Sequence, residues 1–172
     1  MKQSPTTDDS VFHELKSEVD HLDTKYVTTG LSMAGVVAEM FSYKPGWYKG
    51  LYIARGWLAR ILGLEHSPDN NARITEDQVP EKPGQVFESL GENWKAHKIE
   101  PGRFWSMAHE AEHLTAWVFV QKCNKNSGVN EYAVSTLVKY KNPVGRFYFN
   151  LIKPFHHLIV KTALRYIEKS TL

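Results

Sequence analysis

The last third of the chain constrains the fold most, because a strand pattern there runs directly into a long helical pattern. Residues 130–141 are rich in Val, Thr and Tyr, which favour strands. Asn142 can cap a helix, and Pro143 suits its first turn, where the missing N–H would be unpaired in any case. The residues that follow recur at the spacing of one helical face: Val144, Phe147, Tyr148, Leu151, Ile152, Phe155, Leu158, Ile159, Thr162 and Tyr166. The pattern predicts one helix over residues 143–169, bent near Pro154, which lies on an antiparallel sheet and encloses a cavity.

The sheet is predicted from strand patterns that precede this helix. Residues 114–121 and 131–140 are rich in Val, Thr and aromatic side chains. The turn-forming sequence Asn124–Gly128 between them favours an antiparallel hairpin. A further strand is expected over residues 21–28. Most of the segment 84–140 has strand character, so we expect a meander of antiparallel strands.

Two short helices are expected after the first strand. Ser32 can cap the first helix, and Pro45-Gly46 separates it from the second. Gly63 lies where a left-handed cap would end the second helix, and Leu64 can fold back on its last turn. These elements together predict an α+β fold in which an antiparallel sheet grips a long C-terminal helix.

A length of 172 residues fits one domain with a sizeable core. Residues 1–20 are polar, and we expect a mobile tail there. Residues 21–172 are then a single domain. Within it, residues 65–83 are rich in Pro, Asn and charged side chains and lack periodicity, which predicts a polar loop.

Composition favours a soluble protein in a reducing compartment. Hydrophobic residues make up 42% of the chain and charged residues 23%, as in ordinary globular domains, and Cys123 alone cannot form an internal disulfide. No segment approaches the roughly 18 apolar residues of a membrane span, and the first residues lack the apolar core of a signal peptide. We therefore expect a cytoplasmic protein without a transmembrane segment. Lys153, His157, Lys161 and Arg165 follow one another at i+4, which favours a solvated helix face over nucleic-acid binding.

Several short motifs resemble a bacterial family catalogued only as a domain of unknown function. They are Pro45-Gly46-Trp47 with Arg55 and Gly63-Leu64, Glu112-His113-Leu114, Thr136-Leu137-Val138, Gly145-Arg146-Phe147-Tyr148, and Ile152-Lys153-Pro154-Phe155-His156-His157. That family is placed in the START-like, or polyketide-cyclase-like (SRPBCC), helix-grip superfamily. The resemblance runs from about Asp23 to Ile167 and implies a helix-grip fold with a hydrophobic cavity. Superfamily members bind sterols, lipids, plant hormones or polyketides, and a minority catalyse cyclisation or dehydration, so no single catalytic set is implied.

The sequence from His109 to His113 matches the zinc-protease pattern H-E-x-x-H. In those proteases the pattern is helical, both histidines bind the metal and the glutamate polarises a bound water. Here no third-ligand pattern follows, and the residues after His113 favour a strand. Histidines on a strand would lie up to ~13 Å apart, too far to share one ion. We therefore expect no metal site and no cofactor, and we interpret the segment as the polar end of a hairpin.

The closing helix carries His156 and His157 as neighbours. On an ideal helical wheel, His156 lies at the flank of the expected apolar face and His157 nearly opposite it, in solvent. Phe155 is expected on the buried face, beside the cavity. His156 is suited to bind a ligand or act as an acid/base, but it is equally suited to tie the helix to the sheet.

Arg55, and the strand residues Trp117 and Phe119, can be interpreted either as structural or as functional residues. Arg55 lies among apolar residues of the second helix, where it can clamp a ligand carboxylate or pair with an acid to anchor the helix. Trp117 and Phe119 belong to a strand whose two faces are both apolar, so periodicity does not decide which set faces the cavity. One face would be covered by the helix and the other by a partner chain, so a homodimer stays open.

The leading hypothesis is that the cavity between the closing helix and the sheet binds a small apolar or amphipathic molecule without a covalent step. The candidate binding residues are Arg55, Trp117, Phe119, Tyr148, Phe155 and His156. An alternative is a cyclase- or dehydratase-type enzyme that uses His156 or His113 as acid/base. A third is a protein-interaction domain whose cavity is packed. A binding protein is favoured over an enzyme. For His156, a structural role is favoured over ligand binding or catalysis, because a binding group needs convergent polar partners and only one is visible nearby in the sequence.

Overall fold

Six antiparallel strands form one sheet in the order β1-β6-β5-β4-β3-β2. The computed structural model describes residues 10–64, 72–123 and 129–171. The strands are β1 (His21–Thr29), β2 (Val86–Ser89), β3 (Glu92–Glu100), β4 (Phe104–Glu110), β5 (Leu114–Cys123) and β6 (Asn130–Tyr140). The predicted pairing of the two strands before the closing helix is confirmed, since β5 and β6 are antiparallel neighbours from Leu114↔Tyr140 to Cys123↔Glu131. The predicted turn at residues 124–128 lies outside the described residues.

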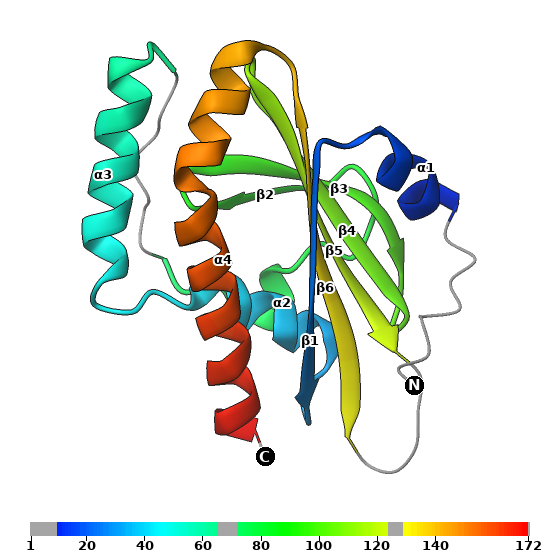
Figure 1. The fold of residues 1–172 in the computed structure, drawn as a ribbon. Helices are drawn as coiled ribbons and strands as arrows, with labels where there is room; N and C mark the ends of the chain where they lie inside the picture. The colour runs from blue at the N-terminus through cyan, green and yellow to red at the C-terminus, as the bar shows by residue number, and fades with distance from the viewer. Residues whose placement is uncertain (1–9, 65–71, 124–128, 172) are drawn as a thin grey trace, which may run out of the picture.

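Four α-helices and one short 3₁₀ helix accompany the sheet in the described part of the chain. They are α1 (Ser10–Glu18), α2 (Met33–Ser42), α3 (Tyr48–Ile61), the 3₁₀ helix η1 (Glu76–Gln78) and α4 (Pro143–Thr171). Figure 1 shows α4 lying along one face of the sheet, with α3 beside it and α1 on the other side of the sheet. This is the predicted α+β arrangement of a sheet that grips a long C-terminal helix. No helix among the described residues is both long and apolar enough to cross a membrane.

The predicted helix ends are confirmed by their hydrogen bonds. Asn142 Oδ1 accepts from the backbone N–H of Gly145 at 2.9 Å, and α4 begins at Pro143 and continues through Pro154. Ser32 Oγ accepts from the N–H of Gly35 at 2.9 Å at the start of α2. Beyond α3, Gly63 adopts φ +68°, and the N–H of Leu64 donates to the Ala59 carbonyl at 2.8 Å, which closes the helix with a left-handed cap.

The buried face of α4 is rotated from the predicted one. Its most buried side chains are Tyr148, Phe149, Ala163, Leu164 and Ile167. The expectation that Phe155 would be buried is wrong, because its side chain is 47% exposed. The expectation that His157 would lie in solvent is also wrong, because its Nδ1 is 3.1 Å from Asp23 Oδ2 on β1. Apolar residues cover more than half the circumference of this helix, so spacing alone did not select the stripe that packs on the sheet.

The expected N-terminal tail is helical from Ser10 to Glu18, and this corrects our prediction for that part of residues 1–20. Phe12, Leu15 and Val19 recur at helical spacing, and all three pack on the outer face of the sheet, away from α4. Acidic residues lie between the members of this short apolar stripe, which weakens its signal in the sequence. The tail prediction for residues 1–9 lies outside the described residues.

The predicted loop at 65–83 is partly described. Residues 65–71 lie outside the described part, and residues 72–83 contain only the 3₁₀ helix Glu76–Gln78. Ile74 and Val79 from this segment join the core between α2 and the sheet. The segment therefore contributes two buried anchors to the domain although most of it is polar.

Candidate ligand-binding site

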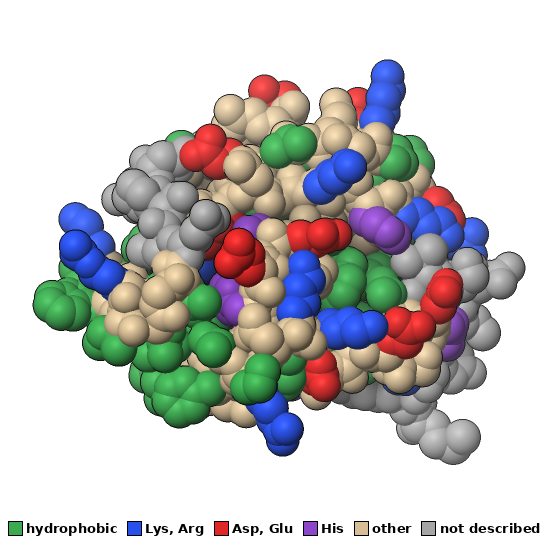
Figure 2. Space-filling model, turned by 90° about the horizontal axis from the view of Figure 1, so that it is seen from above, with side chains coloured by type: hydrophobic (Ala, Val, Ile, Leu, Met, Phe, Trp, Pro, Cys, Tyr) green, Lys and Arg blue, Asp and Glu red, His purple; other side chains and the backbone are tan. Residues whose placement is uncertain are grey.

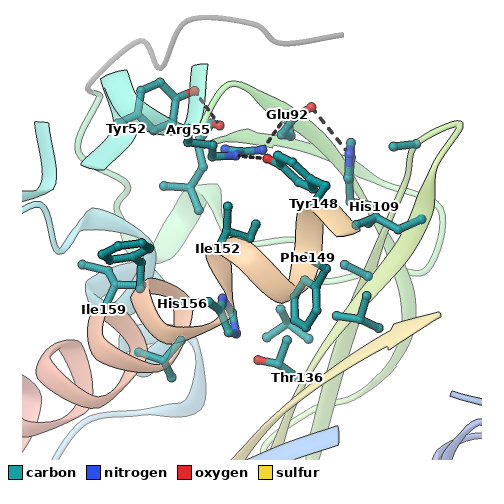
Figure 3. Close-up of a pocket in the computed structure, with 18 of the residues that line it drawn as sticks. Tyr52, Arg55, Glu92, His109, Thr136, Tyr148, Phe149, Ile152, His156 and Ile159 are labelled. Atoms are coloured by element: carbon teal, nitrogen blue, oxygen red, sulfur yellow. Dashed lines mark hydrogen bonds and ion pairs between the residues drawn. The ribbon is translucent and has the colours of Figure 1, made fainter. Parts of the chain in front are cut away.

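A pocket of about 470 Å³ lies between α3, α4 and the inner face of the sheet (Figure 3). The inner face of the sheet forms one wall of this pocket, because every second side chain of a strand points to the same face. The inner-facing residues are Ala116, Val118, Val134, Thr136 and Val138. The opposite wall is formed by Leu51 and Leu58 of α3 and by residues one or two turns apart on α4: Ile152, His156, Ile159 and Ala163.

The polar end of the pocket joins four elements of the fold. Arg55 on α3 donates from Nε to the Tyr148 hydroxyl on α4 at 2.7 Å, and its Nη2 lies 2.9 Å from Glu92 Oε1 on β3. Glu92 Oε2 lies 3.5 Å from Nε2 of His109 on β4. Tyr52, one helical turn before Arg55, donates its hydroxyl proton to the Leu90 carbonyl at 3.0 Å. Figure 3 shows these side chains gathered at one end of the pocket.

The H-E-x-x-H segment lies on a strand end and a turn rather than on a helix. His109 belongs to β4, which ends at Glu110, and His113 directly precedes β5. Nδ1 of His109 lies 3.0 Å from the carbonyl of Asn93, which fixes that ring against β3. The described residues contain no group of three or more His, Cys, Asp or Glu side chains arranged to hold a metal ion. The segment is therefore the polar end of the β4–β5 hairpin.

His113 is buried against the start of α4. Its ring meets the ring of Tyr148 edge-on, with centroids 5.2 Å apart. Burial lowers the pKa of His113, and the nearby His109 and Arg55 lower it further. His113 is therefore a neutral imidazole at pH 7, and it lines the pocket beside the Arg55 network.

His156 brings a second neutral imidazole to the pocket wall. It points from α4 toward the sheet, near Phe149 and Thr136 (Figure 3), and its buried Nε2 has no hydrogen-bond partner among the described residues. Burial lowers the pKa of His156 to about 3, and nearby His157 and Lys25 act in the same direction. A buried polar atom without a partner is rare in folded proteins, and within the described part of the chain Nε2 of His156 is such an atom in the wall between α4 and the sheet.

A further histidine lies behind this wall. His21 on β1 packs against Phe149, with ring centroids 5.1 Å apart, and its Nε2 is also buried without a partner among the described residues. Burial, followed by the charges of Lys153, His157 and Lys25, lowers the pKa of His21 to about 4. His157 binds Asp23, and Asp23 also pairs with Lys25. Burial, followed by the charges of Lys25 and Lys153, lowers the pKa of His157 as well, so the β1–α4 contact holds three neutral histidines beside the Asp23–Lys25 ion pair.

Five of the residues singled out from sequence line the pocket, and two do not. Arg55, His113, Tyr148, Phe155 and His156 belong to the lining, with Phe155 at its exposed edge. Trp117 and Phe119 face the other side of the sheet, where Phe119 packs with Phe104, Leu137 and Phe12 of α1. Their expected place beside the cavity is wrong, because their strand parity is opposite to that of Ala116 and Val118. The second face of β5 is covered by α1 of the same chain.

Sequence reasoning missed Glu92, Tyr52 and Thr136. Glu92 begins a strand and is separated from Arg55 by 37 positions, so only the folded chain brings the two charges together. Tyr52 lies three residues before Arg55, which places both on one side of a helix. That spacing was the one sequence signal that could have linked Tyr52 to the site.

An antiparallel sheet that grips a long C-terminal helix over an apolar pocket defines a START-like helix-grip protein. Within that class, the chain belongs to the DUF2867 family, described as "Protein of unknown function", whose profile matches residues 16–163. The sequence match therefore establishes the family, and the description of the family names no activity. None of the curated proteins compared with the chain matches it.

Several solved structures are similar to the chain at low sequence identity. A START superfamily protein from Mycobacterium smegmatis is 11% identical, with 88% of this chain and 100% of that chain covered and a TM-score of 0.44. Protein MLL2253 from Mesorhizobium loti is 10% identical, with 88% and 100% covered and a TM-score of 0.45. Ara h 8.0201 is 13% identical, with 86% and 97% covered and a TM-score of 0.41. At these values no residue role is transferred from them.

Proposed function

We propose that the protein binds a small amphipathic molecule in the pocket between α3, α4 and the sheet. The observation that carries the proposal is the pocket itself, with about 470 Å³ of free volume, mostly apolar walls and polar groups gathered at one end. Ligand sites in proteins have this combination of size, apolar lining and few placed polar groups. A packed interaction domain would fill such a volume, so the geometry favours binding over the third hypothesis.

The polar end favours a neutral hydrogen-bonding group on the ligand. Arg55 is compensated by Glu92 at 2.9 Å, and the lowered pKa values of His113 and His156 keep both imidazoles uncharged at pH 7. A ligand carboxylate would therefore have to displace Glu92 from the only cation at this end of the described pocket. A hydroxyl, carbonyl or amide group can instead share the existing network.

The same pKa values weigh against the enzyme alternative. An effective general base has a pKa near the working pH, whereas His156 has a pKa of about 3 and that of His113 is also lowered. Both imidazoles are then weak bases near neutrality. They suit hydrogen bonding to a bound molecule better than proton abstraction from it.

A cavity-filling variant tests the proposal. Ala116 lies on the pocket wall, so Ala116→Phe places a ring in the free volume. The matched control is Ala108→Phe, because Ala108 pairs with Trp117 on the outer face of the same sheet. The probe is a fluorescent fatty alcohol. We expect its affinity to fall at least tenfold in Ala116→Phe and to stay within about twofold in Ala108→Phe, the loss reflecting displaced apolar contact.

Native mass spectrometry of the protein purified from its own host gives the independent check. A co-purifying small molecule that is lost in Ala116→Phe would support the pocket as its site. Thermal melts of both variants ensure that each is folded. Equal probe affinity for the two folded variants, or no probe uptake by the unsubstituted protein, would refute the proposal.

A further inference from the structure

Large apolar side chains are exposed along both helices that border the pocket. On α3, Trp57 is 68% and Ile61 is 74% exposed, and on α4, Phe147 is 59% exposed. We call the whole set the apolar face: Trp47, Ile53, Trp57, Ile61, Val144, Phe147, Leu151, Phe155 and Leu158. Figure 2 shows hydrophobic side chains gathered on the side of the molecule where α3 and α4 lie. Contiguous exposed apolar surface of this kind marks an interaction site.

The apolar face borders the pocket through two of its residues on α4. Leu151 and Phe155 are exposed members of the face and also line the pocket. Ala54, an exposed residue of α3, lines it too, one turn before Trp57 on the same helix. The pocket therefore has an apolar edge along the two helices, whereas the exposed Glu110 and Glu112 line it at the β4–β5 turn.

The charged residues of the two segments that carry the face are all positive. Residues 43–64 contain four Lys or Arg and residues 141–167 contain five, and neither segment contains an Asp or Glu. Arg60 directly precedes Ile61, and Arg165 follows Leu158 by two helical turns, so each lies beside the apolar face. Both are exposed, and neither forms an ion pair with a described residue. The face thus combines aromatic and aliphatic side chains with two exposed cations, Arg60 and Arg165.

This charge pattern argues against a second copy of the chain as the occupant. A two-fold interface places the same patch of each copy against the other, so the cations of α3 and α4 would meet those of the other copy without an acid from either helix. An anionic bilayer supplies the complementary charge. Trp, Phe and Leu side chains enter the boundary between headgroups and acyl chains, while Lys and Arg meet lipid phosphates.

We propose that the apolar face of α3 and α4 docks the protein on an anionic lipid bilayer, with the pocket mouth turned toward the lipid. The docking proposal depends only on the exposed residues and their charges. Exchange of the pocket's ligand with the bilayer additionally rests on the proposed function. In that geometry an apolar molecule reaches the pocket without crossing water.

Vesicle flotation tests the docking. The full chain is mixed with phosphatidylcholine vesicles that contain about 30% phosphatidylserine, or none, at low and high salt. We expect binding to the anionic vesicles that weakens as salt is raised. Trp57→Ser/Phe147→Ser and Arg60→Ala/Arg165→Ala should each lower the partition coefficient about tenfold or more, since each cation near an anionic surface contributes about fivefold.

Matched controls lie on the sheet edge, away from both helices. Val86 on β2 is 66% exposed and Lys95 on β3 is exposed, so Val86→Ser/Lys95→Ala changes one apolar and one cationic side chain elsewhere. This variant should bind as the unsubstituted protein does. A second readout is the blue shift of tryptophan emission on vesicle binding, which Trp57→Phe should reduce while binding persists.

Three results would overturn the docking proposal. The first is no binding to anionic vesicles, and the second is an equal loss in the control variant. The third is a dimer in analytical ultracentrifugation that Trp57→Ser/Phe147→Ser dissociates, since the face would then belong to a second copy. Ala116→Phe separates the two proposals: it should keep vesicle binding even if the pocket binds nothing.

Discussion

Arg55 on α3 donates a hydrogen bond from Nε to the hydroxyl of Tyr148 on α4, at 2.7 Å. The same guanidinium reaches Glu92 on β3 with Nη2, at 2.9 Å. One planar cation thereby connects two helices and a strand, an arrangement for which the rigid fork of arginine is well suited. The sequence left two interpretations of Arg55 open, a clamp for a ligand carboxylate and a pair with an acid. The structure contains the pair with an acid, Glu92.

Arg55→Ala should destabilise the fold clearly. The substitution removes two hydrogen bonds and leaves Glu92, whose side chain is only 17% exposed, without its cation. Because both side chains keep some solvent contact, we expect a loss of about 2–3 kcal/mol in a urea melt, below the range for fully buried pairs. Arg60→Ala, on the same helix and exposed, should change stability by no more than about 0.5 kcal/mol. Similar losses for the two variants would contradict the bridging role.

Much of the fold could be predicted because local signals and tertiary structure agree. Asn142 and Pro143 specify the start of α4, and Gly63 specifies the end of α3, through hydrogen bonds that need no distant partner. The β5–β6 pairing follows from two strand patterns and one turn signal. α1 was missed because three apolar residues within nine are a weak signal, and only the exposed apolar outer face of the sheet gives them a partner.

The candidate site was predicted only in part, because its geometry depends on which faces pack. Arg55, Tyr148 and His156 line the pocket as expected, whereas Trp117 and Phe119 lie on the wrong side of β5. A strand with two apolar faces gives no local sign of which face meets the helix. On α4 the apolar residues that do not pack on the sheet form an exposed stripe at the edge of the pocket. The helix therefore carries two apolar stripes, and spacing alone did not show which of them is buried.

His156 should make stability depend on pH. The pKa of His156 is about 3 in the folded protein and near 6.5 in the unfolded chain. Below pH 6.5 the unfolded chain binds a proton at His156 and the folded protein does not. The free energy of unfolding therefore falls as pH falls toward 3. His156→Phe removes this term and the partnerless Nε2. Relative to the unsubstituted protein, its free energy of unfolding should rise by about 2 kcal/mol between pH 7 and pH 5.

Urea melts at the two pH values check this expectation. The exposed His97 supplies the control, and His97→Phe should leave the difference unchanged. The lowered pKa of His21, about 4, acts in the same direction, so some slope should remain in His156→Phe. Parallel stability curves for His156→Phe and the unsubstituted protein would show that His156 is not buried in its neutral form.

Two phenylalanines on α4 separate the packed wall from the pocket edge. Phe149 is 4% exposed and packs with Tyr140 and His21, whereas Phe155 is 47% exposed at the pocket mouth. Phe149→Ala should therefore cost about 3–5 kcal/mol, as for other buried aromatic residues. Phe155→Ala should cost less than about 1.5 kcal/mol, because much of its surface already lacks protein contacts. Denaturant melts that reverse this order would return α4 to the orientation predicted from sequence.

Gly145 is the point of closest approach between α4 and the β4–β5 turn. A Cβ built there would overlap the backbone carbonyl oxygen of His113 and lie 2.7 Å from its carbonyl carbon. That carbonyl also accepts from the N–H of Lys141 at 3.0 Å, so the turn is held on both sides. Because the obstacle is backbone rather than a side chain, it cannot rotate away. The glycine of the Gly145-Arg146-Phe147-Tyr148 motif is thus explained by packing.

Gly145→Ala should therefore force the start of α4 away from the turn, with a loss of about 3 kcal/mol in a urea melt. It should also weaken binding of the fluorescent fatty alcohol, because the His113–Tyr148 contact borders the polar end of the pocket. Gly50 on α3 is the matched control, since nothing lies within 4 Å of a Cβ added there. Gly50→Ala should stabilise the protein by about 0.5–1 kcal/mol, as alanine does in an exposed helix interior. Opposite signs for the two glycines are expected, and equal effects would mean that α4 does not touch the turn at Gly145.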